Sequence, residues 1–291
     1  MEKMDLHSPA KLNLVLDLIR KREDGYHETD FVMQELELCD SIEIRETEKE
    51  IKITSNKSYI PTGKNNTCYQ AVELVKEFAE KKNIPTKGIH IHLEKNIPIA
   101  GGLGGGSSNA ATVIKGLNKI WNLNLSKEEM MTIASKIGSD VSFFIEGGTC
   151  RATGRGEIIA PIEKCPTLHL AFISPPIKTP KNKTAWIYSH FNVQNVSIHP
   201  SVDEIRKAIQ SNDAKKVAEK MGNVFEALSL KEYVPVFHLI ESLKTLPGVW
   251  NAILAGAGPT VCAICENEKT AHQIIAPFEA KGWETIVTKT K

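Results

Sequence analysis

The alternation of hydrophobic and polar residues predicts several strands in the first third of the chain. Residues 41–46 (SIEIRE) and 50–55 (EIKITS) alternate as half-buried antiparallel strands do. Residues 88–96 (GIHIHLEKN) place isoleucine and leucine on one face and histidine and glutamate on the other. We therefore expect a sheet with one buried face in this region.

Helical periodicity appears between and after these strands. Residues 66–84 repeat hydrophobic positions at helical spacing opposite a polar face. Residues 107–123 show the same pattern, and residues 126–140 open with a capping box, in which Ser126 is followed three residues later by Glu129. The first half of the chain is therefore expected to mix strands and helices.

The second half repeats this mixture. We expect helices near residues 201–230 and 235–245, then a strand with a glycine loop in residues 251–265, and a closing helix and strand. The composition shifts near residue 160, where a strand runs into a loop rich in proline, lysine and asparagine. The pattern predicts an α/β protein of two domains, 1–160 and 161–291.

Composition and charge narrow the function classes. The chain has 291 residues, of which 41% are hydrophobic and 24% charged, as in globular proteins. Lys plus Arg number 36 and Asp plus Glu 35, so the net charge of +1 argues against a general nucleic-acid or membrane-surface binder. The sequence contains no run of about eighteen apolar residues, which is the length that a membrane-spanning helix needs. The net charge does not exclude a local binding site for an anion.

Two groups of residues resemble metal sites, and in both cases a structural role is favoured. His90 and His92 share the polar face of their strand, but no third ligand stands at a suitable spacing. Cys262 and Cys265 form a C-x-x-C without a second pair, so a hydrophobic strand explains them better than zinc does. The six scattered cysteines indicate a reduced, cytoplasmic protein.

Residues 98–112 (PIAGGLGGGSSNAAT) form a glycine-rich loop before a predicted helix. The loop is no Walker A motif, because no lysine follows the glycines, and it fails the dinucleotide fingerprint, which would need glycine where Ser107 stands. A flexible linker is the alternative, but linkers do not join a strand to a helix in this way. Ser107, Ser108 or Asn109 could cap the helix, whose free amides favour an anion. The loop predicts phosphate binding without specifying a reaction.

The same loop resembles the glycine-rich signature of the GHMP kinases, in which it wraps the phosphates of ATP. Two further segments match in order: SPAKLNLVLDL near the start resembles the first motif of the family, and AGAGPTVCAI near the end resembles its last. The resemblance implies a two-domain fold, with an N-terminal domain like domain 2 of ribosomal protein S5 and a C-terminal ferredoxin-like α/β sandwich. It also implies ATP and Mg²⁺ as cofactors.

Within this family, the segments PAKLNLVL, REDGYHE, GGLGGGSSNAA and GSDVSFFIEGGTCRATGRGE resemble the members that phosphorylate a cytidylated sugar alcohol in non-mevalonate isoprenoid synthesis. The last motif carries alanines at positions where serines are frequent in the family. The loop 174–191 is slightly longer than the family pattern. Two alternatives stay open: a kinase for another small alcohol, such as mevalonate or homoserine, and a non-catalytic nucleotide-binding regulator. The pattern predicts no particular oligomeric state.

The resemblance assigns roles in the chemical step and in ATP binding. It implies that Asp140 accepts the proton of the hydroxyl group and that Lys11 lies beside the same hydroxyl, although each residue alone would be read as a surface group. No carboxylate is identified as a ligand of Mg²⁺. The positions implied to contact ATP are Asn66, Lys95, Gly101, Gly102, Leu103, Gly104, Gly105, Gly106, Ser107 and Ser108.

The substrate side follows from the DGYH segment. Tyr26 and His27 match the cytidine site of the family, because cytosine offers a ring for stacking and an edge for hydrogen bonds. Tyr188 matches the aromatic position on the opposite side of the base, with Trp186 as its rival, and Asn13 matches a substrate contact. Tyr26 could instead be a core aromatic and His27 a turn residue. Gly256 and Gly258 are expected to form a second glycine turn.

Overall fold

The computed structural model describes residues 3–180, 182–228 and 233–291. The chain folds as two compact units. Unit 1 comprises Met1–Ala10, Leu38–Pro98 and Gly104–Gly147. Unit 2 comprises Lys11–Glu37, Ile99–Leu103 and Gly148–Lys291. The units interleave along the sequence because two long strands, β1 (Lys3–Lys21) and β2 (His27–Thr47), each contribute to both. The domain division expected at residue 160 stays a prediction.

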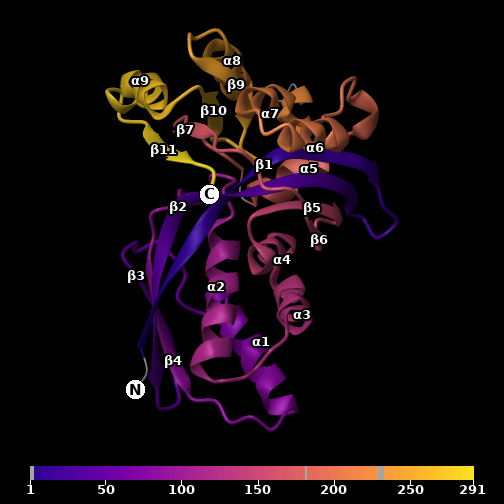
Figure 1. Ribbon diagram of the computed structural model, residues 1–291. Coiled ribbons are helices and arrows are strands. Elements are labelled where there is room, and N and C mark those ends of the chain that lie inside the picture. Colours follow the sequence, from indigo (N-terminus) through magenta and orange to yellow (C-terminus); the bar gives the residue numbers. More distant parts are fainter. Residues whose placement is uncertain (1–2, 181, 229–232) are drawn as a thin grey trace. The chain divides into compact units, whose positions relative to one another are not determined.

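Unit 1 has helices on one side of its strands (Figure 1). Its strands are the part of β1 up to Ala10 and the part of β2 from Leu38, together with β3 (Ile51–Ser55) and β4 (Gly88–Glu94). Strand β4 runs antiparallel to β2 and parallel to β3, so the antiparallel arrangement expected of residues 50–55 was wrong. The helices are α1 (Thr67–Lys81), α2 (Gly105–Ile120), α3 (Lys127–Ile137) and α4 (Ser139–Glu146). The predicted alternation is confirmed, since the isoleucines of β4 are fully buried.

The capping box predicted at the third helix is also confirmed. The hydroxyl group of Ser126 accepts a hydrogen bond from the main-chain N–H of Glu129, and the Glu129 carboxylate accepts one from the N–H of Ser126. Two of the free amides at the start of α3 are thereby satisfied. This local pattern fixes the first residue of α3.

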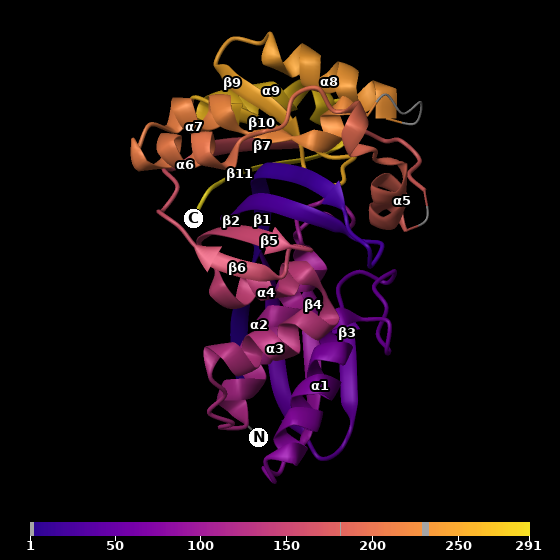
Figure 2. The same ribbon diagram turned by 90° about the vertical axis from the view of Figure 1, so that its right-hand side faces the viewer.

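Unit 2 contains a four-stranded antiparallel sheet in the order β11-β7-β10-β9 (Figure 2). Its strands are β7 (His169–Ser174), β9 (Val249–Leu254), β10 (Val261–Cys265) and β11 (Glu284–Lys289). Helices α8 (Val234–Lys244) and α9 (Glu268–Glu279) pack on this sheet. The connectivity and strand order are those of a ferredoxin-like sandwich, as the resemblance implied.

Further elements of unit 2 extend the β1–β2 ladder or precede β9. Strand β5 (Thr149–Gly154) pairs antiparallel with β2 and with β6 (Ile158–Pro161), and β1 pairs in parallel with the short β8 (Gly222–Asn223). The remaining helices are α5 (Lys183–His190), η1 (Val193–Asn195), α6 (Val202–Gln210), α7 (Ala214–Lys220) and η2 (Val224–Ala227). Thus residues 201–228 hold helices, as expected, with β8 between them. Residues 229 and 230 lie outside the described residues.

The two metal-like motifs lie in strands β10 and β4. Cys262 and Cys265 are fully buried in β10, and none of the six cysteines, all of which lie in the described ranges, forms a disulfide. The hydroxyl of Thr54 lies 2.9 Å from both His90 Nε2 and His92 Nδ1. Over the described ranges, no group of three potential ligands is placed to hold a metal ion. None of the helices in those ranges is both long and apolar enough to cross a membrane.

The start of β4 generates a prediction about stability. A Cβ atom on Gly88 would lie 2.6 Å from the main-chain nitrogen of Glu50 and 2.6 Å from the carbonyl carbon of Lys49. These are backbone atoms, so they can move only if the β2–β3 connection moves. We expect Gly88→Ala to lower the free energy of unfolding by about 1–3 kcal/mol in urea denaturation. Gly63→Ala is the control, because nothing lies within 4 Å of a Cβ there. Equal losses in both variants would contradict this prediction.

Candidate functional site

The glycine loop meets the first turn of α2, which has no side-chain cap. Gly104 is the N-cap residue with a φ of 71°, and α2 begins at Gly105. The expectation that Ser107, Ser108 or Asn109 caps the helix was therefore wrong. The helix starts earlier because glycine adopts the left-handed conformation that turns the chain into it. The amides of this first turn are left to an anion or to water.

A buried ion pair lies beneath the start of α2. The ammonium group of Lys95 pairs with the carboxylate of Asp40 and donates a 2.7 Å hydrogen bond to Oδ1 of Asn109. Asp40 is fully buried, and its Oδ1 accepts hydrogen bonds from the main-chain N–H groups of Asn96 (2.7 Å) and Ile97 (2.9 Å). The network therefore ties β2, the chain after β4 and α2 together. The nucleotide contact implied for Lys95 stays a prediction.

The two serines of the loop have different surroundings. The Ser108 hydroxyl is buried and lies 2.7 Å from the hydroxyl of Ser8 in β1. Asn109 donates to the same Ser8 oxygen at 2.9 Å and to Asp40 at 2.9 Å. Ser107 is only partly buried. Ser107 is thus the better placed of the two serines to meet a ligand at the start of α2.

Asn66 is the N-cap of α1. Its Oδ1 accepts a 2.8 Å hydrogen bond from the N–H of Cys68, and its Nδ2 donates a 2.6 Å bond to the carbonyl of Pro61. The next residue, Thr67, donates to the carbonyl of Gly106 at 2.8 Å. The starts of α1 and α2 are therefore linked. The implied ATP contact of Asn66 stays a prediction.

Asp140 lies in the first turn of α4, directly after Gly138 and Ser139. Helix α4 packs against α2 in unit 1. Asp140 is therefore held at the start of a short helix that packs within unit 1.

In unit 2, β1 presents Lys11 and Asn13 on one face. Both are buried, and Nζ of Lys11 donates a 2.5 Å hydrogen bond to Oδ1 of Asn13. Residues two apart in a strand share a face, which brings these side chains together. The N–H of Lys11 also donates to the carbonyl of Leu103 at 3.0 Å, so β1 contacts the glycine loop at this point.

The glycine loop and the last motif meet backbone to backbone within unit 2. Gly102 has a φ of 84°, and a Cβ atom there would lie 2.0 Å from the carbonyl oxygen of Ala255. Gly256 has a φ of 54° and Gly258 one of 65°, consistent with the predicted second glycine turn. Only a residue without a side chain at position 102 permits this approach. Asn223 holds the turn by donating to the carbonyls of Leu254 (2.8 Å) and Gly256 (2.7 Å).

His27 lies among aromatic rings. Its ring centre is 5.8 Å from that of Tyr188 and 5.9 Å from that of Phe191. The pKa of His27 is lowered by burial and by the charge of Lys21, so its imidazole is neutral at pH 7. A neutral imidazole has one donor and one acceptor nitrogen. The cluster can therefore combine stacking with a hydrogen bond.

The two rival aromatic residues of α5 face different partners. Trp186 stacks on Tyr233, with ring centres 5.9 Å apart and an interplanar angle of 14°, whereas Tyr188 lies beside His27. Tyr26 is 57% exposed, and the guanidinium carbon of Arg155 lies 4.8 Å from its ring centre. The exposure of Tyr26 argues against a core role for it.

Several residues of these clusters were not predicted from the sequence. Asp40 follows an alternating stretch without any local motif, Phe191 was noted only as the end of the loop 174–191, and Asn223 belongs to no family motif. Lys183, which contacts the carbonyls of Ala100 and Gly258, was also missed. Their partners are distant in sequence, so no spacing rule could have found them.

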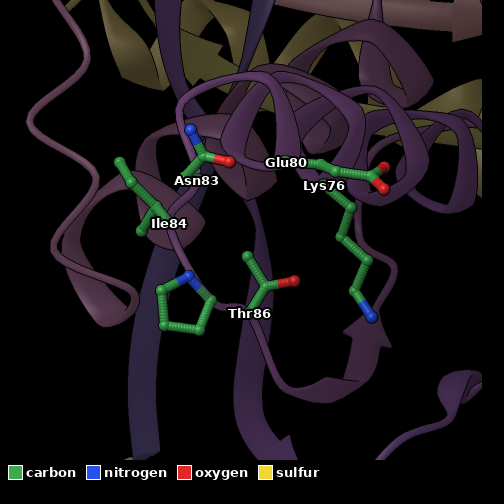
Figure 3. A pocket seen from close by; sticks show the side chains of 6 residues that line it. Lys76, Glu80, Asn83, Ile84 and Thr86 are labelled. Atoms are coloured by element: carbon green, nitrogen blue, oxygen red, sulfur yellow. The ribbon is translucent and has the colours of Figure 1, made fainter.

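A hollow of about 480 Å³ lies elsewhere, where α1 ends (Figure 3). Its lining residues are Lys76, Glu80, Asn83, Ile84, Pro85 and Thr86. None of them was predicted as a site residue, and the glycine loop takes no part in the lining. The hollow therefore adds nothing to the candidate site.

Comparison with known families and proteins yields consistent matches. The model of the GHMP kinases N-terminal domain matches residues 66–148, and that of the GHMP kinases C-terminal domain matches residues 203–283. A 4-diphosphocytidyl-2-C-methyl-D-erythritol kinase from Geobacillus kaustophilus is 40% identical over 274 residues, covering 94% of this chain and 91% of the relative. One of the same name from Acetivibrio thermocellus is 36% identical over 290 residues and covers 100% of both chains.

Solved structures share the fold. A crystal structure of 4-(cytidine 5'-diphospho)-2C-methyl-D-erythritol kinase matches with a TM-score of 0.80 at 24% identity, over 99% of both chains. A homoserine kinase from Cytophaga hutchinsonii matches with a TM-score of 0.76 at 14% identity, covering 100% of this chain and 95% of the other. At these identities the likeness concerns the fold alone.

The buried ion pair of unit 1 generates a second prediction. Asp40→Asn would remove the charge opposite Lys95, and leaving a buried cation uncompensated is strongly destabilising. We expect a loss of about 3–5 kcal/mol in the free energy of unfolding, measured by urea denaturation. Glu77→Gln, which breaks the exposed pair with Lys81, should cause no measurable loss. Similar stability of the Asp40 variant and the wild type would refute the importance of the network.

A third prediction concerns pH and the turn near β9. Burial raises the pKa of Glu226 from 4.5 to about 7, although its Oε1 accepts a 3.0 Å hydrogen bond from the N–H of Leu254. A raised pKa means that the stabilising contribution is complete below pH 4.5 and is lost as the pH rises through 7. Relative to wild type, Glu226→Gln should gain up to about 3 kcal/mol of unfolding free energy between pH 4.5 and pH 8.5. Parallel stability curves for the two proteins would show that Glu226 titrates normally.

Proposed function

The chain belongs to the GHMP kinase family, and from this premise we propose that it phosphorylates 4-diphosphocytidyl-2-C-methyl-D-erythritol. The γ-phosphoryl group of ATP would pass to the 2-hydroxyl group, giving the 2-phosphate and ADP in the non-mevalonate route to isoprenoid precursors. The observation that carries this proposal is the identity of 36–40%, over 94–100% of the chain, with curated kinases of that name.

On the nucleotide side, the uncapped first turn of α2 supports binding of the ATP phosphates. The amides of Gly105, Gly106 and Ser107 would donate to phosphate oxygens, with Gly101, Gly102, Leu103 and Gly104 shaping the approach. Mg²⁺ would neutralise charge on the phosphate oxygens during transfer. We assign Lys95 and Asn66 the task of fixing the starts of α2 and α1, since their polar atoms bond within unit 1.

For the chemical step, we assign Asp140 as the group that accepts the proton of the substrate hydroxyl. It lies in the first turn of α4, a short helix that packs against α2. We assign Lys11 to orient the hydroxyl and to lower the cost of its developing negative charge, with Asn13 holding the ammonium group. Phosphoryl transfer depends mainly on such positioning and charge stabilisation, so few chemical groups are needed.

On the substrate side, the aromatic cluster of unit 2 supports a cytidine site. His27 would bond to the edge of cytosine through its neutral imidazole, and Tyr188 would contact the face of the ring. We choose Tyr188 over Trp186 because Trp186 stacks on Tyr233. Tyr26, which is exposed beside Arg155, completes the proposed contacts.

We also propose that the enzyme works in the cytoplasm. The six cysteines, all within the described ranges, form no disulfide, and five of them are buried, as in proteins kept in a reducing compartment. Neither the substrate nor the family gives a reason for export.

The test is ADP release with Mg-ATP and 4-diphosphocytidyl-2-C-methyl-D-erythritol, run beside mevalonate and homoserine. We expect turnover only with the cytidylated substrate. Asp140→Asn should lower kcat by about 10²–10⁴-fold, the usual contribution of a general base. Asp203→Asn is the matched control, because Asp203 is an exposed aspartate in the first turn of another helix, α6, and should leave kcat unchanged.

The other outcomes separate the alternatives. Turnover with mevalonate or homoserine would keep the kinase activity and overturn the substrate. Binding of ATP without turnover of any alcohol would favour a nucleotide-binding regulator. Full activity of Asp140→Asn would leave the reaction intact and remove Asp140 from the role of base.

A further inference from the structure

Lys183 is an unusual residue of unit 2 because it is a buried lysine without a described carboxylate partner. It is 8% exposed, whereas lysines are almost never this buried unless they are paired. Its ammonium group donates hydrogen bonds to two main-chain carbonyls, those of Ala100 and Gly258. Each carbonyl belongs to one of the two glycine-rich segments that meet in unit 2.

The position of Lys183 is unfavourable for a cation. It is the first residue of α5, after Asn182 in the left-handed conformation with a φ of 53°. The positive end of a helix dipole disfavours a lysine there. Burial, with a further contribution from the charge of Lys11, lowers the pKa of Lys183 to about 8. Burial at the start of a helix is thus unfavourable for the ammonium group of Lys183, so the stability of the fold does not account for a lysine at this position.

The two carbonyls lie where the backbone is strained or free of side chains. Ala100 has a φ of 57°, which is costly for a residue with a Cβ atom. Gly258 has a φ of 65°. Between them, Gly102 approaches Ala255 so closely that no side chain would fit. A cation that attracts both carbonyls therefore holds loop 99–103 against turn 255–258 and keeps Ala100 in its strained conformation.

We propose that Lys183 is a positioning residue for nucleotide binding, which clamps loop 99–103 to turn 255–258. Loop 99–103 leads directly into Gly104, the N-cap of α2, so the clamp sets the path of the chain into the helix start. This inference deepens the proposed function and rests on it for the identity of the nucleotide. An ammonium group has three N–H donors, and two carbonyls engage two of them.

The experiment compares wild type with Lys183→Met, which keeps the length of the side chain and removes the charge. Binding of a non-hydrolysable Mg-ATP analogue is measured by calorimetry at pH 7. Hydrogen exchange of residues 99–103 and 255–258 is measured in the same proteins. We expect at least tenfold weaker analogue binding and at least tenfold faster exchange in both segments. Lys127→Met is the control, because Lys127 is the exposed first residue of α3.

Steady-state kinetics separate positioning from general damage. In Lys183→Met, KM for ATP should rise at least tenfold, while KM for the cytidylated substrate should stay within about twofold of wild type. Binding by the wild type should weaken above pH 8, as Lys183 loses its proton, and this dependence should vanish in the variant. Two neighbouring groups do not account for it: Lys11, on β1, is present in both proteins, and burial raises the pKa of Tyr233 to about 12.

Each remaining outcome decides one question. Wild-type analogue binding and exchange in Lys183→Met would overturn the clamp. Loss of the folded state in both Lys183→Met and the milder Lys183→Gln would also overturn it, making Lys183 a stability residue. If wild type fails to turn over the cytidylated substrate but the variant still binds the analogue more weakly, the proposed function falls and the clamp stands.

Discussion

The arrangement of unit 1 depends on the buried ion pair between Lys95 and Asp40. A carboxylate taken out of water is tolerated only if its oxygens are satisfied, and Asp40 receives hydrogen bonds from two backbone amides as well as from Lys95 and Asn109. These donors come from the chain after β4 and from α2. The pair therefore fixes where α2 starts relative to the strands of unit 1. It thereby also fixes the position of the N–H groups in the first turn of α2, which have no side-chain cap.

In unit 2, contacts to the main chain hold the glycine-rich segments in place. Gly102 lies against Ala255, the amide of Asn223 binds the carbonyls around the second glycine turn, and Lys183 contacts one carbonyl on each side. Polar side chains that bind carbonyls stabilise loop conformations that have no regular secondary structure to support them. Both units thus hold a glycine segment by buried polar groups, one by an ion pair and the other by donors to main-chain oxygens.

Local patterns in the sequence predicted much of the fold. The capping box at Ser126 and the alternation of β4 are confirmed, because both depend on residues a few positions apart. The start of α2 was misplaced, since the left-handed conformation of Gly104 is not visible in a helical pattern. Asp40 and Lys183 escaped notice because their burial arises from partners that are more than fifty residues away. The family motifs supplied the site residues that spacing alone left undecided.

The interleaving of the two units has a consequence for synthesis on the ribosome. The segments of unit 1 are complete once Gly147 has emerged, whereas the part of β2 that belongs to unit 2 pairs with β5, which begins only at Thr149. Residues 27–37 are therefore made early and wait for their partner for on the order of ten seconds at ordinary rates of translation. During that time a hydrophobic strand edge is exposed, so the nascent chain has a window in which chaperone binding would protect it from aggregation.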